Sequence, residues 1–221
     1  MKPAAMAEQG IQRLTNTAYT RFGKRTLDLA LALPALVLLS PFLLILALLI
    51  KIDSRGPAFY GQERVGRDGR LFTLWKLRSM VVGAATLGSG IHVEQGDSRI
   101  TRIGTLLRRL SLDELPQLWN VVEGDLSLVG PRAGLKYQAD LYDDRERRRL
   151  LVRPGLTGWA QVRGRRTIDW PARIALDLEY IEQVSFLKDL DILARTIPTV
   201  LGGEGLVSGS DYWGERARRR K

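Results

Sequence analysis

Residues 29–50 read "LALALPALVLLSPFLLILALLI", a run of 22 residues without a charged side chain. At about 1.5 Å per residue, a helix of this length can cross a hydrocarbon layer of roughly 30 Å. The run is longer than the apolar part of a cleavable signal sequence, and the polar residues Lys51, Asp53 and Arg55 follow it. We therefore predict a retained membrane helix.

Two prolines interrupt this run. Pro34 and Pro41 each remove an intrahelical N–H donor, and the hydroxyl of Ser40 can bond to a freed carbonyl, which favours a sharp bend at Ser40 and Pro41. A re-entrant helix should be basic at both ends, whereas a single span should be asymmetric. Both flanks are basic, with Arg21, Lys24 and Arg25 before the run and Lys51, Arg55 and Arg64 after it. The residues alone leave a re-entrant helix and a kinked single span both open.

The composition bounds the chemistry. A chain of 221 residues has room for this membrane segment and one small domain. Its net charge of +10 predicts attraction to nucleic acid, anionic lipid or phosphorylated substrates. The absence of cysteine and the single histidine, His92, exclude a thiolate nucleophile, a cysteine-based metal site and a multi-histidine site. Catalysis, if present, must therefore use carboxylates, hydroxyls, lysine or arginine.

Behind the membrane run the pattern indicates one compact unit. Turn signals within residues 59–80 predict a β-hairpin with strands near 58–65 and 70–77, followed by a loop over 83–97. Apolar spacing predicts helices from Arg102 onward and over 138–151, 172–184 and 189–201, the last interrupted at Pro198. The tail "ERARRRK" (215–221) has nothing to bury, so we expect it to be solvated or to lie on anionic lipid.

The stretch "SLDELPQLWN" (111–120) places Asp113 and Glu114 side by side, next to Arg108 and Arg109. Ser111 and Glu114 have the spacing of a helix capping box, in which the acidic pair has a structural role. Alternatively, a helix begins at Pro116 and the carboxylates lie just before its N-terminus, in a field that also attracts phosphate. Both interpretations stay open on the residues alone.

Two further stretches are candidates for anion binding. In "GDLSLVGPRAG" (124–134) a Gly-Pro turn presents Arg132, whose planar guanidinium matches the oxygens of a phosphate. In "RPGLTGWAQVRGR" (153–165) glycines accompany Arg163 and Arg165, a combination that suits a nucleotide diphosphate. Trp159 in the same stretch could stack on a base, although a place in the core is favoured.

An ordered series of motifs carries a family resemblance. It comprises "KRTLD" (24–28), the Ser-Pro of the apolar helix, the hairpin region from Gly56 to Met80, "LRRLSLDELPQLWNVVEGDLSLVGPR" (107–132) and residues 153–165. Over residues 24–205 the chain resembles the monotopic polyprenyl-phosphate phosphoglycosyl transferases, or bacterial sugar transferase family. The family usually has Pro-Arg-Pro where this chain has Pro131, Arg132 and Ala133, which removes one constraint on the loop of Arg132.

The resemblance implies a mostly helical α+β fold with a re-entrant membrane helix broken at Ser40 and Pro41, amphipathic interfacial helices and a small β-hairpin region. It divides the chain into an N-terminal segment (1–23), the re-entrant helix (24–52), a cytosolic catalytic domain (53–205) and a basic tail (206–221). The protein would be monotopic, on the cytoplasmic face of the bacterial inner membrane.

The resemblance also implies the reaction. A sugar 1-phosphate would pass from a UDP-sugar to polyprenyl phosphate with Mg²⁺ and release of UMP, in the synthesis of glycoconjugates such as exopolysaccharides. Asp113 would be the nucleophile that forms a covalent phosphosugar intermediate, Glu114 its partner, and both would be Mg²⁺ ligands. The candidate phosphate- and nucleotide-binding residues are Lys76, Arg78, Arg109, Arg132 and Arg163. Anionic membrane lipid is a further expected partner, nucleic acid is not, and a homodimer is left open.

A second hypothesis comes from another functional class. A membrane-tethered basic module that binds nucleic acid or anionic lipid without chemistry would account for the net charge and the apolar anchor. It leaves the acidic pair unexplained. Under either hypothesis the sequence does not indicate which sugar is involved.

Overall fold

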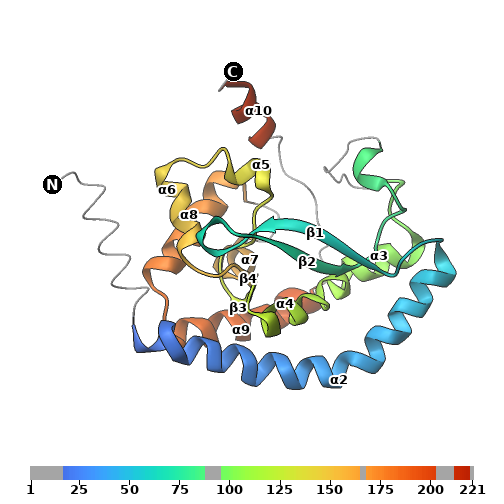
Figure 1. Ribbon diagram of the computed structural model, residues 1–221, viewed down its shortest axis with the longest axis horizontal. Helices are drawn as coiled ribbons and strands as arrows, with labels where there is room; N and C mark the ends of the chain where they lie inside the picture. The colour runs from blue at the N-terminus through green and yellow to red at the C-terminus, as the bar shows by residue number, and fades with distance from the viewer. Residues whose placement is uncertain (1–16, 88–95, 165–167, 203–211, 220–221) are drawn as a thin grey trace.

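The computed structural model describes residues 17–87, 96–164, 168–202 and 212–219 (Figure 1). Helices predominate, and the strands form two small two-stranded sheets, so the predicted α+β class is confirmed. The longer helices are α2 (Lys24–Asp53), α3 (Arg102–Arg109), α4 (Gln117–Glu123), α7 (Trp159–Gly164), α8 (Trp170–Glu182), α9 (Phe186–Leu201) and α10 (Tyr212–Arg219). The strands are β1 (Phe59–Val65), β2 (Leu71–Leu77), β3 (Ser127–Val129) and β4 (Gly155–Thr157).

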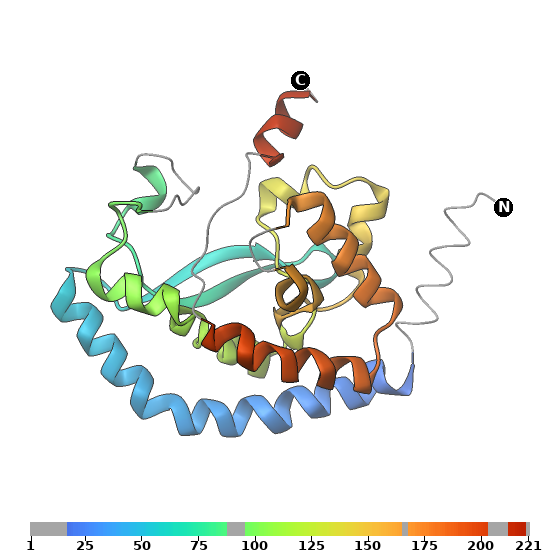
Figure 2. The same ribbon diagram turned by 180° about the vertical axis from the view of Figure 1, so that it is seen from behind.

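Helix α2, preceded by a short π-helical turn (Tyr19–Gly23), bows beneath the rest of the molecule and turns both ends toward it (Figures 1 and 2). Pro34 and Pro41 lie inside this continuous helix, so the break predicted at Ser40 and Pro41 is a gentler bend. Pro41 has no N–H to offer the carbonyl of Val37, four residues earlier. The hydroxyl of Ser40 donates to that carbonyl oxygen at 2.8 Å, which supplies the missing bond as predicted.

The two faces of α2 have different surroundings. Ala32, Leu43, Leu46 and Ile50 are buried against the domain, in two apolar clusters. The opposite face is exposed and apolar, and includes Leu31, Val37, Leu38, Leu44, Ile45, Leu48 and Ile52. The segment Tyr19–Asp53 is long and apolar enough to cross a membrane by length and composition. An exposed apolar face of this extent indicates contact with a membrane or with another protein.

The predicted hairpin is present, with β1 paired antiparallel to β2 from Phe59 opposite Leu77 to Val65 opposite Leu71. The side chain of Asn120 in α4 forms two hydrogen bonds with the backbone of β2. Its side-chain oxygen accepts from the N–H of Trp75 at 3.0 Å, and its amide nitrogen donates to the carbonyl of Thr73 at 2.8 Å. The hairpin is thereby fixed to the helix that follows the acidic pair.

The second sheet lies in the core. Strands β3 and β4 are parallel, with Ser127 opposite Gly155, and β3 is buried along its whole length. Tyr180 and Ile181 of α8 and Ile192 of α9 are fully buried in the same apolar cluster. Helix α9 packs against both strands of the small sheet, and α8 contributes to the same apolar cluster.

Two predictions about helices are wrong. Residues 138–151 form α5 (Lys136–Ala139), α6 (Asp144–Arg147) and a 3-10 helix (Arg148–Leu151) rather than one helix. The cause is Asp143, which exchanges capping hydrogen bonds with Glu146 and starts a new helix there. Helix α9 continues through Pro198 without the predicted interruption.

The expectation for the tail 215–221 holds only in part, because Glu215, Arg218 and Arg219 are exposed but Arg216 contacts the domain. Trp213 of α10 is buried, and Arg216 forms ion pairs with Glu146 and Asp143. Helix α10 is thus docked on the domain through Trp213 and Arg216. His92, Arg165, most of the predicted loop 83–97 and the remaining tail residues lie outside the described ranges.

Candidate active site

The acidic pair occupies a tight turn between α3 and α4. Ser111 adopts a left-handed conformation (φ 56°), and residues Leu112–Glu114 form a single 3-10 turn before Pro116 leads into α4. The side chain of Ser111 makes no capping hydrogen bond, so the capping-box interpretation is wrong and the helix begins after Pro116. The carboxylates therefore lie before a helix N-terminus rather than inside a helix.

Asp113 lies in the wall of a cavity of about 340 Å³, and its exposed fraction is 4%. Its carboxylate accepts no hydrogen bond from any residue that the structure describes. Burial raises the pKa of Asp113 above its ordinary value and Glu114 raises it further, whereas Lys76 and Arg108 oppose the rise. The carboxylate of Asp113 therefore lies at the cavity surface without a hydrogen bond from the described residues.

Glu114 has the opposite environment. One of its oxygens, Oε1, accepts from Lys76 Nζ at 2.9 Å and from Arg132 Nη2 at 2.7 Å. Burial would raise the pKa of Glu114, but Arg132 and Lys76 together hold it well below its ordinary value. Two neighbouring carboxylates in such different environments are suited to different roles. Glu114 stays ionised and positions two cations, and Asp113 remains available.

The loop that carries Arg132 is held by four consecutive carbonyl groups. The carbonyl oxygens of residues 131, 132, 133 and 134 accept hydrogen bonds, respectively, from Gly155 N at 2.9 Å, Arg149 Nη2 at 3.0 Å, Arg64 Nη1 at 3.2 Å and Val65 N at 3.0 Å. These donors come from β4, the 3-10 helix 148–151 and β1. The loop is thus fixed by its backbone although Ala133 replaces the second proline of the family pattern.

Arg149 is the buried centre of this support. Its guanidinium pairs with Asp177 at 2.7 Å, donates to the hydroxyl of Tyr142 at 2.6 Å and reaches the carbonyl of Arg132. Asp177 also lines the cavity. Sequence reasoning missed both residues, because Arg149 stands in the charged run "DRERRRLL", which is typical of a solvated helix.

Of the other predicted site residues, the structure brings Lys76 to the acidic pair and places Arg78, Arg109 and Arg163 elsewhere. Lys76 belongs to the site through Glu114. Arg78 is buried and donates to the carbonyls of Ser54, Arg55 and Pro57, so it fixes the chain after α2 instead of facing a substrate.

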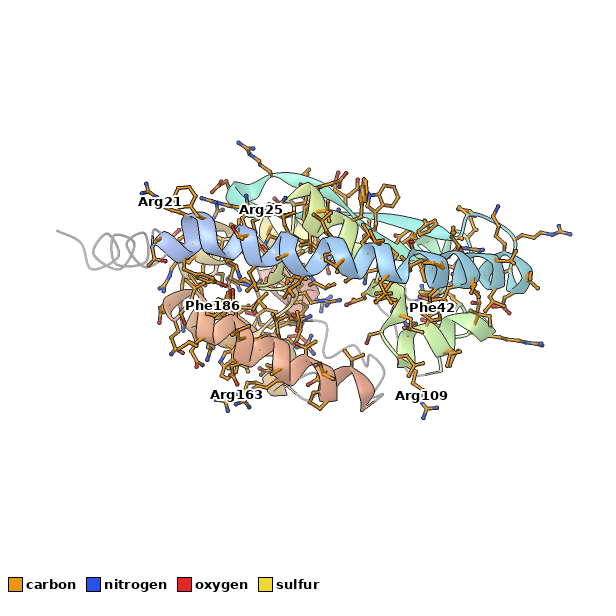
Figure 3. The ribbon with its side chains drawn as sticks, turned by 90° about the horizontal axis from the view of Figure 1, so that it is seen from below. Arg21, Arg25, Phe42, Arg109, Arg163 and Phe186 are labelled. Carbon is orange, nitrogen blue, oxygen red and sulfur yellow. The ribbon has the colours of Figure 1, made fainter. Side chains whose placement is uncertain are left out.

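Arg109 is exposed and projects away from the molecule, whereas its neighbour Arg108 lines the cavity (Figure 3). Arg163 stacks on Trp159 and is not among the residues of the cavity wall.

The wall of the cavity carries both charged and apolar side chains. Arg108, Arg132 and Arg173 line it together with Asp113. Much of the remaining wall is apolar, with Leu112, Leu115, Leu128, Leu156 and Leu193. Such a cavity can hold a phosphorylated compound next to a carboxylate and can also accept an apolar group.

Asp113 and Glu114 are the residues that could hold a metal ion. Among the described residues no three acidic or histidine side chains gather into a complete ligand set. Mg²⁺ in phosphate-transferring sites often takes one or two protein carboxylates and completes its shell with substrate phosphate and water. The carboxylate oxygens of Asp113 accept no hydrogen bond from the described residues, so they could serve as one of these few protein ligands.

Comparison with known proteins identifies the family of this chain. The profile of the family described as "Bacterial sugar transferase" matches residues 19–203. The uncharacterized sugar transferase EpsL of Bacillus subtilis is 41% identical over 193 residues, which cover 87% of this chain and 94% of that protein. The UDP-galactose-lipid carrier transferase of Erwinia amylovora is 42% identical over 200 residues, 84% of this chain and 42% of the relative.

A third relative has an intermediate length. The UDP-glucose:undecaprenyl-phosphate glucose-1-phosphate transferase of Caulobacter vibrioides is 44% identical over 187 residues, which cover 80% of this chain and 69% of the relative. The profile match spans most of the chain and contains the acidic pair, the Arg132 loop and α2. The resemblance drawn from the motifs is confirmed, and the chain belongs to the bacterial sugar transferase family of enzymes.

Proposed function

We propose that this protein transfers a sugar 1-phosphate from a UDP-sugar to polyprenyl phosphate, giving a polyprenyl-diphosphate-linked sugar and UMP. The proposal rests on the position of Asp113. Its carboxylate accepts no hydrogen bond from the described residues and lies in a cavity wall together with Arg132 and several leucines. The named relatives from Erwinia and Caulobacter support the choice of a nucleotide-sugar donor and a lipid acceptor.

In the first step an oxygen of Asp113 attacks the phosphorus that bears the sugar. The bond from this phosphorus to the oxygen of the UMP phosphate breaks, and UMP leaves with the bonding electron pair. In the second step a phosphate oxygen of polyprenyl phosphate attacks the same phosphorus, the bond to Asp113 breaks, and the carboxylate is regenerated. Two displacements allow a water-soluble donor and a lipid acceptor to use one cavity in turn.

The surrounding charges offset the repulsion between Asp113 and an incoming diphosphate. Arg132 and Arg108 contribute positive charge at the cavity, and Glu114 keeps Arg132 and Lys76 in place. Mg²⁺ bound by Asp113 and Glu114 would neutralise phosphate charge. Asp113 would thus be the nucleophile and a Mg²⁺ ligand, and Glu114 would position the two cations and share the Mg²⁺.

Arg132→Lys is expected to lower kcat/KM by one or more powers of ten, about 1.4 kcal/mol for each. Lysine keeps the charge, but a point charge cannot contact Glu114 and a phosphate with the two edges of a planar guanidinium. Steady-state assays would measure the change, with Arg109→Lys as the matched control, because Arg109 is exposed and outside the cavity. Equal kcat/KM values for the two variants would show that Arg132 does not contact the substrate phosphate.

We further propose that α2 is a re-entrant helix and that residues 53–205 form a cytosolic catalytic domain on the inner membrane. The same domain binds both ends of α2. Asp28 accepts hydrogen bonds from Ser127 Oγ at 3.0 Å and Leu128 N at 2.9 Å, and Asp53 accepts from Ile103 N at 3.0 Å. A helix with its ends on opposite membrane faces could not make both sets of contacts.

The topology can be tested with cysteines, since the native chain has none. In intact cells, cysteines introduced at Thr17 and at Arg55 are both expected to be protected from a membrane-impermeant maleimide. Both should react after the membrane is opened, as should a control cysteine at the exposed Arg145. Labelling from outside at one of the two flanking positions but not at the other would contradict the re-entrant arrangement.

The reaction itself is tested with purified full-length protein, a panel of UDP-sugars and polyprenyl phosphate. We expect Mg²⁺-dependent formation of UMP and of a lipid-linked sugar diphosphate, with the preferred donor identifying the sugar. Absence of UMP with every donor, together with salt-sensitive binding of oligonucleotides, would instead favour the non-catalytic basic module.

A further inference from the structure

Three cations converge on one indole ring outside the cavity. Lys188 Nζ lies 3.4 Å from the ring centroid of Trp159, and the guanidinium carbons of Arg163 and Arg195 lie at 4.5 and 5.9 Å. Asp191 is a counter-charge in this group, paired with Arg195 at 2.7 Å. The cluster of Arg163, Lys188 and Arg195 therefore keeps a net positive charge, and the repulsion between its members would be relieved by an anion.

The surface of α9 is divided into sectors. At about 100° per residue, Phe186, Leu190 and Ile197 fall within roughly 40° of one another. All three are exposed, with Ile197 at 64%. Lys188, Asp191 and Arg195 form a polar sector next to Leu187, which is also exposed. An exposed apolar stripe bordered by basic residues is typical of a helix that lies in a membrane interface.

This apolar stripe continues the apolar face of α2. Figure 3 shows α2 and α9 side by side, with Arg163 on the side of α9 away from α2. Phe186 packs edge-on against Tyr19 at 5.9 Å between ring centroids, and Lys24 pairs with Asp189. The basic cluster thus lies at the border of one apolar surface made by two helices.

We propose that Arg163, Lys188 and Arg195 bind the phosphate of an anionic phospholipid headgroup. The proposal rests on the membrane placement given above and is independent of the reaction chemistry. If the apolar faces of α2 and α9 enter the acyl region, the cluster at their border lies at the depth of the headgroups. A phospholipid satisfies both halves of this surface, since its phosphate meets the cations while its acyl chains meet Leu187 and the apolar stripe.

The test uses purified full-length protein in detergent and native mass spectrometry with phosphatidylglycerol or phosphatidylcholine of matched chains. We expect a preference for phosphatidylglycerol in the wild type. Each charge removed should weaken that lipid's affinity about fivefold, so Arg163→Gln/Lys188→Gln/Arg195→Gln should weaken it about a hundredfold. The control Lys136→Gln/Arg145→Gln/Arg147→Gln removes three charges from α5 and α6, which lie away from α2 and α9 (Figure 1), and should bind like the wild type.

Three outcomes would overturn the proposal. These are unchanged affinity in the cluster variant, an equal loss in the control variant, and displacement of the lipid by equimolar inorganic phosphate, which would indicate a free-phosphate site. The three single variants keep the test decisive if the triple variant does not fold, because each should lose about fivefold. UMP formation by the wild type is measured separately, so failure of the lipid site and failure of the proposed reaction are distinguishable.

Discussion

Asp113→Asn is expected to abolish sugar-phosphate transfer, by at least about three powers of ten or ~4 kcal/mol of transition-state stabilisation. Asparagine has the same shape but cannot form the acyl phosphate. The melting temperature should stay nearly unchanged, because Asp113 accepts no hydrogen bond from the described residues and a neutral amide is easier to bury than a carboxylate. Activity assays and thermal unfolding of the same preparation measure both effects.

The covalent step gives a direct test of the same residue. Wild-type protein incubated with a UDP-sugar labelled in the sugar, without acceptor lipid, should retain label in a hydroxylamine-sensitive bond and release UMP in proportion. The labelled peptide should contain Asp113, and the matched variant Glu114→Gln should keep its ability to be labelled at a lower rate. Full activity of Asp113→Asn, or label on another residue, would end the proposed mechanism.

Arg149→Met is expected to destabilise the protein by about 3–5 kcal/mol, because Asp177 would remain buried without its partner. For a chain of this size the melting temperature should fall by roughly 6–20 °C. Activity should fall as well, since the carbonyl of Arg132 would lose its donor and the Arg132 loop one of its four anchors. Thermal unfolding in detergent measures the first effect and steady-state kinetics the second.

The double variant Arg149→Met/Asp177→Leu separates these two consequences. Replacing both members of a buried ion pair by apolar residues often restores stability. We therefore expect the melting temperature to recover most of its loss while activity stays low, because nothing replaces the bond to the carbonyl of Arg132. A single variant as stable as the wild type would show that this buried pair contributes little to the fold.

Local features of the chain predicted much of this protein. The uncharged run 29–50 announced α2, and the turn residues around Asp68 placed both strands of the hairpin within a residue or so. The serine before Pro41 compensates for the missing proline donor as its position predicted. Local signals were misleading where another contact competed, as at Asp143, where a capping box divided an expected helix.

The sequence by itself determined the apolar anchor, the hairpin, the adjacency of Asp113 and Glu114, and the arginine at the Gly-Pro turn. Tertiary structure decided which carboxylate is free, because the cations that engage Glu114 come from positions 76 and 132. It also directed Arg78 to carbonyls after α2 and Arg163 to Trp159, and it brought Arg149 to Asp177, 28 residues away. An arginine has the same appearance in the sequence whether it faces substrate, backbone, ring or lipid, and its partner is determined by chain segments that meet only when the fold is complete.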